Sequence, residues 1–253
     1  MFRHSKVDYD FFESPAYPTI KKGKKKKRQQ HVDTLESNHL ELKKITSKTP
    51  NQNLVFSHFD QGRHLVLNGM AGTGKTFISM YLALREIYDA KASKLYIVRS
   101  ILSARDIGFL PGNLNEKAKI YETPYRDICV ELFSRGDSYE LLKSKGMVEF
   151  VTTSFLRGTT LRNGIILIDE AQNMTSQELS TIMTRVGDNS RVLICGDYFQ
   201  SDLEKEKDRR GILDLLKITQ RMNLFKTVEF QVEDIVRSRF VREFLIAKRE
   251  LKL

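Results

Sequence analysis

Residues 69–76, Gly69-Met70-Ala71-Gly72-Thr73-Gly74-Lys75-Thr76, match the pattern G-x-x-x-x-G-K-[ST] in full. They follow an apolar run, His64–Asn68, that predicts a buried strand, and they open a stretch with helical spacing, Lys75–Asp89. Such a strand, turn and helix form a phosphate-binding loop, because backbone N–H groups and the helix N-terminus converge on an anion. The stretch therefore predicts ATP binding. A glycine-rich turn without a ligand is the alternative interpretation.

Each residue type in this loop has an expected role. Glycine at three positions lets the backbone wrap around phosphate without Cβ clashes. Lys75 is expected to reach the β- and γ-phosphates, and the Thr76 hydroxyl is expected to take one Mg²⁺ position. The predicted nucleotide-binding residues of the loop are Gly69, Met70, Ala71, Gly72, Thr73, Gly74, Lys75 and Thr76.

Further along the chain, short β-rich runs alternate with helical spacing. The predicted strands are His64–Asn68, Leu95–Arg99, Val148–Thr152, Ile165–Asp169, Val192–Gly196 and Thr227–Gln231. The predicted helices are Lys75–Asp89, Glu116–Phe133, Ser176–Arg185, Gly211–Ile218 and Ser238–Lys252, and the charged stretch Glu204–Arg210 is expected to be a loop. This alternation predicts an α/β fold, a mostly parallel sheet with helices on both faces, whose ligands bind at the carboxyl ends of the strands.

The chain of 253 residues has a net charge of +10, unevenly spread. Residues 1–50 carry 12 Lys and Arg against 6 Asp and Glu, and the segment 21–28 is almost wholly basic. Such a block cannot pack against itself. We therefore expect a basic, largely disordered tail over residues 1–45 and an ATPase domain over residues 46–253. The tail could bind a polyanion through counterion release, keep the protein soluble, or serve as a localisation signal.

Composition excludes several classes of protein. No apolar run approaches the roughly 18 residues that cross a bilayer, and the N-terminus lacks a secretory signal. The two cysteines, Cys129 and Cys195, are far apart and without metal-ligand spacing. They are expected to be reduced thiols of a cytoplasmic protein.

A second motif predicts the metal and water chemistry. The run Ile165–Glu170 is four apolar residues followed by two acids. A buried strand that stops at adjacent acids places them at the active edge of the sheet. Asp169 is expected to hold Mg²⁺ as a Walker B aspartate does, and Glu170 to act as general base on the attacking water.

The run Gly196–Gln200 ends a third strand. In P-loop enzymes with a catalytic glutamate, a strand of this kind lies between the Walker A and Walker B strands. Gln200 is therefore predicted to sense the γ-phosphate beside Glu170. In the alternative interpretation, Asp197 caps a helix or turn and Gln200 is a surface residue.

The combined motifs resemble those of the PhoH-like family, ATPases related to the first motor domain of superfamily 1 helicases. The resemblance covers roughly residues 46–245. Beside the phosphate loop, it is carried by Gly-Phe-Leu-Pro-Gly at 108–112, Asp-Glu-Ala-Gln at 169–172, Gly-Asp-x-x-Gln at 196–200 and Asp-Ile-Val-Arg at 234–237. It implies a RecA-like ATPase that uses ATP and Mg²⁺ and acts on RNA or single-stranded DNA. It also implies a homo-oligomer, for which a hexameric ring is one arrangement.

One departure concerns the loop after the second strand. Many members have Arg-Pro there, whereas this sequence has Arg99-Ser100. In this respect the sequence is similar to bacteriophage-encoded members of the family, whose location is the host cytoplasm. Some family members carry a fused PIN nuclease domain, which is not expected here because the N-terminal segment is too short for one.

Residues ahead of the phosphate loop, Thr49–Gln52, resemble the helicase Q-motif. The Gln52 amide has donors and acceptors, so it is predicted to bind the adenine edge. The alternative is a polar helix start with Thr49 or Asn51 as cap.

Helicase-type hydrolysis needs an arginine on the γ-phosphate, worth about 10³–10⁵ in rate. The chain ends soon after Arg237, so no second motor domain is expected to supply it. Arg237 resembles the helicase motif arginine in position and is the predicted catalytic arginine, with Arg185 and Arg157 as alternatives. A neighbouring subunit is the other source, through a head-to-tail contact that closes into a ring.

Contacts to nucleic acid are predicted less sharply. Phe109, Tyr198 and Phe199 could stack on bases, although such residues are more often core or loop-anchoring aromatics. A function of another class also fits the sequence: a module that assembles or binds a partner under ATP control, with slow hydrolysis and no helicase activity.

Overall fold

The computed structural model describes residues 40–100, 114–156, 158–198 and 206–251. The predicted basic tail therefore lies almost entirely outside the described residues. Its last predicted positions are described, and they pack on the domain. Leu40 is buried, and the backbone N–H of Lys43 donates to the Leu132 carbonyl at 2.9 Å. The unit that contains the sheet begins at Leu40.

Six parallel strands form one sheet in the order β3-β2-β4-β5-β1-β6. Their bounds are β1 His64–Gly69, β2 Lys94–Arg99, β3 Val148–Thr152, β4 Gly164–Ile168, β5 Arg191–Gly196 and β6 Phe225–Phe230. The predicted α/β, RecA-like P-loop fold is confirmed. In particular, β5 lies between β4 and β1, as predicted for the strand between Walker B and Walker A.

The sheet is apolar on both faces because successive side chains of a strand point to opposite sides. In β1, Leu65 and Leu67 join one core cluster, whereas Val66 joins the other. All five residues of β4 are buried. Continuous apolar runs of this kind are what a parallel sheet covered on both faces requires.

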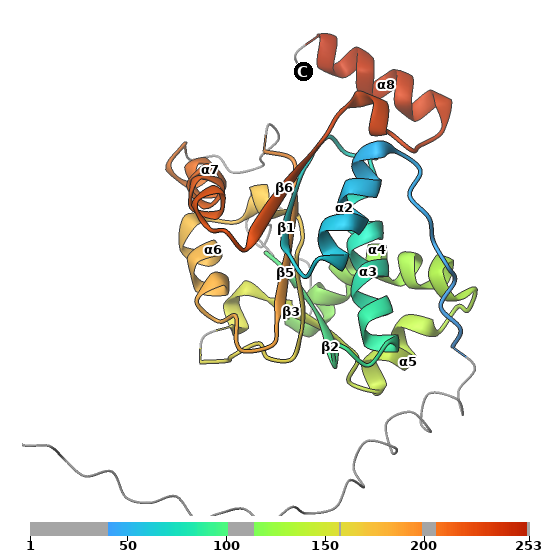
Figure 1. The fold of residues 1–253 in the computed structure, drawn as a ribbon, viewed down its shortest axis with the longest axis vertical. Coiled ribbons are helices and arrows are strands. Elements are labelled where there is room, and N and C mark those ends of the chain that lie inside the picture. Colours follow the sequence, from blue (N-terminus) through green and yellow to red (C-terminus); the bar gives the residue numbers. More distant parts are fainter. Residues whose placement is uncertain (1–39, 101–113, 157, 199–205, 252–253) are drawn as a thin grey trace, which may run out of the picture. The chain divides into compact units, whose positions relative to one another are not determined.

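Helices cover each face (Figure 1). The cluster on one face is completed by α2, α3, α4 and α5, and that on the other by α6 and α7. Their bounds are α2 Pro50–Asp60, α3 Lys75–Tyr88, α4 Leu114–Phe133, α5 Ser138–Ser144, α6 Ser176–Met183 and α7 Glu206–Arg221. The short α5 was not predicted. The expectation of a loop before Gly211 was wrong, because α7 already begins at Glu206.

Near the C-terminus, α8 spans Arg239–Glu250 and is capped by the Ser238 side chain, which accepts from Val241 N. None of its residues is buried, and Figure 1 shows it beyond the carboxyl end of β6. Among the residues that the structure describes, no helix has the length and apolar character to span a membrane.

Candidate nucleotide-binding site

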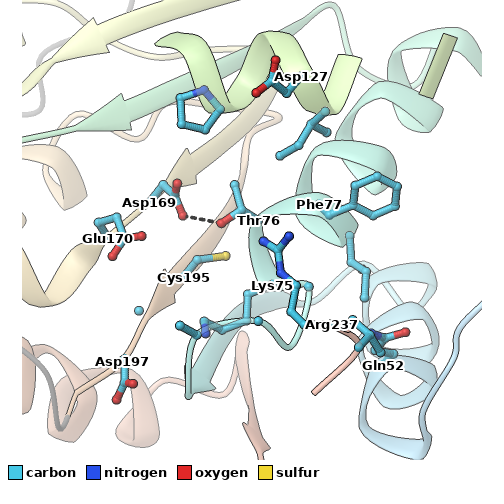
Figure 2. A pocket seen from close by; sticks show the side chains of 18 of the residues that line it. Gln52, Lys75, Thr76, Phe77, Asp127, Asp169, Glu170, Cys195, Asp197 and Arg237 are labelled. Atoms are coloured by element: carbon cyan, nitrogen blue, oxygen red, sulfur yellow. Dashed lines mark hydrogen bonds between the residues drawn. The ribbon is translucent and has the colours of Figure 1, made fainter. Parts of the chain in front are cut away.

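A cavity of about 600 Å³ opens at the carboxyl ends of β1, β4 and β5, the edge predicted for ligands. The phosphate loop forms one wall, and the ends of β4 and β5 form another. Segment 45–52, α4 and the segment before α8 close the remaining sides, so residues far apart in sequence converge on one space (Figure 2).

The phosphate loop has the backbone that its glycines allow. Gly69 has a φ of 140°, and a Cβ on it would lie 2.4 Å from the Phe230 carbonyl oxygen of β6. Gly72 has a φ of 83°, and its Cβ would lie 2.9 Å from Arg237 Cγ. Left-handed backbone and close neighbours both exclude a side chain at these positions. The loop then enters α3 at Lys75, where the helix N-terminus faces the cavity.

Lys75 bends over its own loop. Its ammonium donates to the carbonyls of Gly69 at 2.5 Å and Met70 at 2.8 Å. Burial lowers the pKa of Lys75, against the opposing effect of nearby acidic groups. The positive charge therefore lies in partly buried surroundings, where its attraction for a phosphate is stronger than in bulk water.

The loop and the acid motif meet directly. Thr76 Oγ1 donates to Asp169 Oδ1 at 2.8 Å, and both side chains line the cavity (Figure 2). A hydroxyl and a carboxylate side by side fit Mg²⁺, which prefers hard oxygen ligands and keeps several waters and phosphate oxygens. The two residues predicted to hold the metal are thus adjacent.

A buried tyrosine holds the other oxygen of the same carboxylate. The Tyr125 hydroxyl, on α4, donates to Asp169 Oδ2 at 2.8 Å, and the positive charge of Arg99 acts on both groups. Burial and the neighbouring Glu170 raise the pKa of Asp169, while the hydrogen bonds from Tyr125 and Thr76 lower it. Arg99, whose loop the sequence left without a role, lies in the cavity wall.

Glu170 stands next to these groups in an unusual backbone conformation, with φ 52° and ψ 44°. Its Oε2 accepts from Gln172 Nε2 at 2.6 Å, and Gln172 Oε1 accepts from the backbone N–H of Asp197 at 3.1 Å. A non-glycine residue in this region costs about 1 kcal/mol, and such strain concentrates at functional sites. Gln172 therefore fixes the carboxylate and joins the ends of β4 and β5.

Gln52 lies on the opposite wall, at the start of α2 as its alternative role predicts. Thr49 is the N-cap of α2, since its hydroxyl accepts from Gln52 N. The Gln52 side chain lines the cavity and is nearly buried. Its Nε2 donates to the Thr73 carbonyl at 3.1 Å, and its Oε1 accepts from Lys48 N at 2.7 Å. Each atom retains a second hydrogen-bonding position, so the adenine contact stays a prediction.

The segment before α8 is fastened to the phosphate loop. Val236 N donates to the Gly72 carbonyl at 3.0 Å. Asp234 is buried and accepts from Asn51 Nδ2 at 2.7 Å and from Gln231 N at 2.8 Å. These bonds place Arg237 in the cavity wall of its own chain, where Figure 2 shows its side chain extending beside the loop.

The other predicted residues are placed less favourably. Arg185 follows α6, and its carbonyl accepts from Leu161 N ahead of the amino end of β4, opposite the cavity. Tyr198 packs against a core cluster, as its alternative role predicts. The remaining predicted residues lie outside the described ones: Phe109, Arg157, Phe199 and Gln200.

Sequence reasoning missed Tyr125 and gave no role to Arg99 or Gln172. Gln172 stands in a quoted motif, so its position was a usable signal. Tyr125 gave no signal, because an aromatic residue within a helical pattern predicts core packing.

The chain also has relatives among known proteins. The profile of the PhoH-like protein family matches residues 44–248. A PhoH-like protein of Mycobacterium leprae (strain TN) is 31% identical over 209 residues, 82% of this chain and 59% of that protein. Protein PhoH of Escherichia coli (strain K12) is 34% identical over 181 residues, 71% of this chain and 51% of that protein. The chain thus spans little more than half the length of these relatives.

Solved structures give a more distant likeness. The large terminase of a thermophilic bacteriophage is 13% identical, with a TM-score of 0.48 over 81% of this chain and 50% of that chain. The SWI2/SNF2 ATPase core of Sulfolobus solfataricus, solved in complex with dsDNA, is 16% identical, with a TM-score of 0.42 over 69% of this chain and 37% of that chain.

Proposed function

Because the chain belongs to the PhoH-like protein family, we propose that it binds ATP with Mg²⁺ in this cavity and hydrolyses it. One observation carries the proposal: Thr76 and Asp169 are hydrogen-bonded at 2.8 Å, so the phosphate loop and the acid pair face one another. An apolar strand followed by acids is common, but acids in contact with a phosphate loop are the arrangement that hydrolysis of a triphosphate needs.

The residues of the chain divide the chemistry between them. Lys75 and the loop N–H groups hold the β- and γ-phosphates. The Glu170 carboxylate, oriented by Gln172, accepts a proton from the water that attacks the γ-phosphorus. Arg237 compensates the charge that develops on the transferred phosphoryl group, and Gln200 senses that group. Thr76 and Asp169 would hold Mg²⁺, which supplies charge neutralisation between the β- and γ-phosphates.

We further propose that RNA or single-stranded DNA stimulates this turnover. The support is the net charge of +10, which favours a polyanionic partner, together with the family's relation to helicase motors. A homo-oligomeric ring is part of the same proposal. Arg237 lines the cavity of its own chain, which supports a catalytic arginine supplied by the same subunit.

The decisive experiment measures ATP turnover with and without RNA and single-stranded DNA, for wild type, Glu170→Gln and Arg237→Ala. Both variants are expected to retain nucleotide binding, and Arg237→Ala to lose about 10³-fold or more in turnover. Unchanged turnover in Glu170→Gln would show that Glu170 is not the general base. Turnover indifferent to both polymers would contradict the nucleic-acid coupling.

A second candidate function is ATP-controlled assembly with slow hydrolysis. One observation favours it: α8 has no buried residue, yet it follows directly on Arg237 in the cavity wall. In that case ATP would change the assembly state, and turnover would not respond to either polymer.

A further inference from the structure

One side of α8 rests on the phosphate loop. The Leu245 side chain packs near Gly72, because a Cβ built on that glycine would lie 3.5 Å from Leu245 Cδ1. The Arg249 guanidinium donates to the sulfur of Met70 at 3.9 Å. Leu245 and its helical neighbours Val241 and Lys248 are partly covered. This side of the helix therefore already has its partner.

An adjacent side of α8 carries an apolar stripe in solvent, and Lys248 lies between the two sides. Phe240 is 80% exposed, Phe244 60% and Leu251 68%, and the exposed Ala247 lies between them. Their spacing of four, three and four residues puts all of them on one face of the helix. Large apolar side chains exposed together in this way mark a binding surface.

The spacing is that of a coiled-coil seam, with Phe244 and Leu251 at a positions and Phe240 and Ala247 at d positions. Glu243 and Glu250 then occupy the g positions, and Lys248 occupies an e position. In a parallel pair of such helices, a g residue faces the e residue five positions later in the partner. Glu243 of each copy would thus face Lys248 of the partner subunit.

We infer that α8 pairs in parallel with α8 of a second copy of this chain through this stripe. The antiparallel arrangement would bring Glu243 near Glu250 of the partner subunit, a like-charge contact that disfavours it. Nucleic acid fits less well, because the same glutamates line one edge of the stripe. Glu243 already pairs with Arg239 at 2.7 Å. Because both side chains are exposed, breaking this pair to form the one between subunits costs little.

This contact is two-fold, so each α8 pairs with one other α8 and no more. An assembly that has the contact is therefore expected to contain twice as many subunits as one that lacks it. Sedimentation of the full chain, in the absence of ATP, measures the mass of the assembly. Phe244→Glu is expected to halve the mass of the particle, while Ile218→Glu, at a residue 56% exposed on α7, leaves it unchanged. Nucleotide binding and helical content check that both variants fold.

Charge exchange tests the parallel register. Glu243→Lys and Lys248→Glu are each expected to weaken association about tenfold, and the double variant to restore it. A monomeric wild type, or an assembly unaffected by Phe244→Glu, would overturn the inference. So would a Phe244→Glu variant that loses RNA binding at unchanged mass, since that result assigns the stripe to nucleic acid.

A cysteine at a d position tests the geometry directly, because Cys129 and Cys195 are buried and do not compete. Ala247→Cys is expected to give a covalent dimer under mild oxidation, and Arg242→Cys, on another side of α8, is not. Failure of Ala247→Cys to cross-link while the wild type is oligomeric would place the contact elsewhere.

Discussion

Replacing Tyr125 by phenylalanine removes one buried hydroxyl that contacts Asp169 in the cavity wall, and nothing else. That hydroxyl donates to Asp169 Oδ2 at 2.8 Å, and both side chains are buried. Without it, the pKa of Asp169 rises further, since this hydrogen bond is among the effects that lower it. The carboxylate also loses the contact that fixes its orientation. Both changes weaken a Mg²⁺ ligand, which must be ionised and aligned.

The size of the effect follows from the contact. A hydrogen bond to a charged group contributes about 1.5–3 kcal/mol, which corresponds to about 10- to 150-fold in affinity. Loss of a partner that orients a metal ligand costs a similar factor of about 10–100. We therefore expect Tyr125→Phe to raise the Mg²⁺ concentration for half-maximal ATP turnover by about 10- to 100-fold. A smaller effect is expected on turnover at saturating Mg²⁺.

The matched control is Tyr139→Phe. Tyr139 is equally buried, and its hydroxyl donates to Glu122 Oε2 at 2.7 Å, away from the cavity. Lys143 still pairs with Glu122 in the variant, so the loss affects stability alone. Titrations of Mg²⁺ at fixed ATP compare the two variants. Equal half-maximal concentrations in wild type, Tyr125→Phe and Tyr139→Phe would refute the argument.

Three further predictions concern stability. Gly69→Ala is expected to cost about 2–4 kcal/mol more than Gly146→Ala, because both have positive φ but only the first meets the Phe230 carbonyl; urea unfolding that finds equal costs would contradict this. Asp234→Ala should lower the free energy of unfolding by about 1–3 kcal/mol, because two donors lose their acceptor. It should also slow ATP turnover more than it weakens nucleotide binding, because it frees the segment that carries Arg237. A larger effect on binding than on turnover would contradict this role of Asp234. Burial raises the pKa of Cys129 from 9.0 to about 12, so the unfolded chain loses this proton first. The free energy of unfolding should therefore fall as pH rises from 9 towards 12, less steeply in Cys129→Ala; parallel profiles would exclude the thiol as a cause.

The sequence by itself determined the sheet and the chemistry at its edge. The apolar runs of β1, β4 and β5 are continuous because both faces of a parallel sheet are covered, so they identified the strands without ambiguity. The phosphate loop could be recognised because its backbone requires glycine at fixed positions. The acids at 169 and 170 followed from the end of β4, since parallel strands share one carboxyl edge.

Only the tertiary structure decided which distant residues line the cavity and hold its walls in place. Tyr125 reaches Asp169 from a helix 44 residues earlier, and Asn51 bonds Asp234 across 183 residues. Neither pair has a periodic signal, because a single hydrogen bond between remote segments depends on how the layers pack. The same holds for Arg237, which enters the cavity of its own chain because the segment before α8 bonds to the Gly72 carbonyl. Local patterns specify elements, whereas contacts between elements arise from their packing.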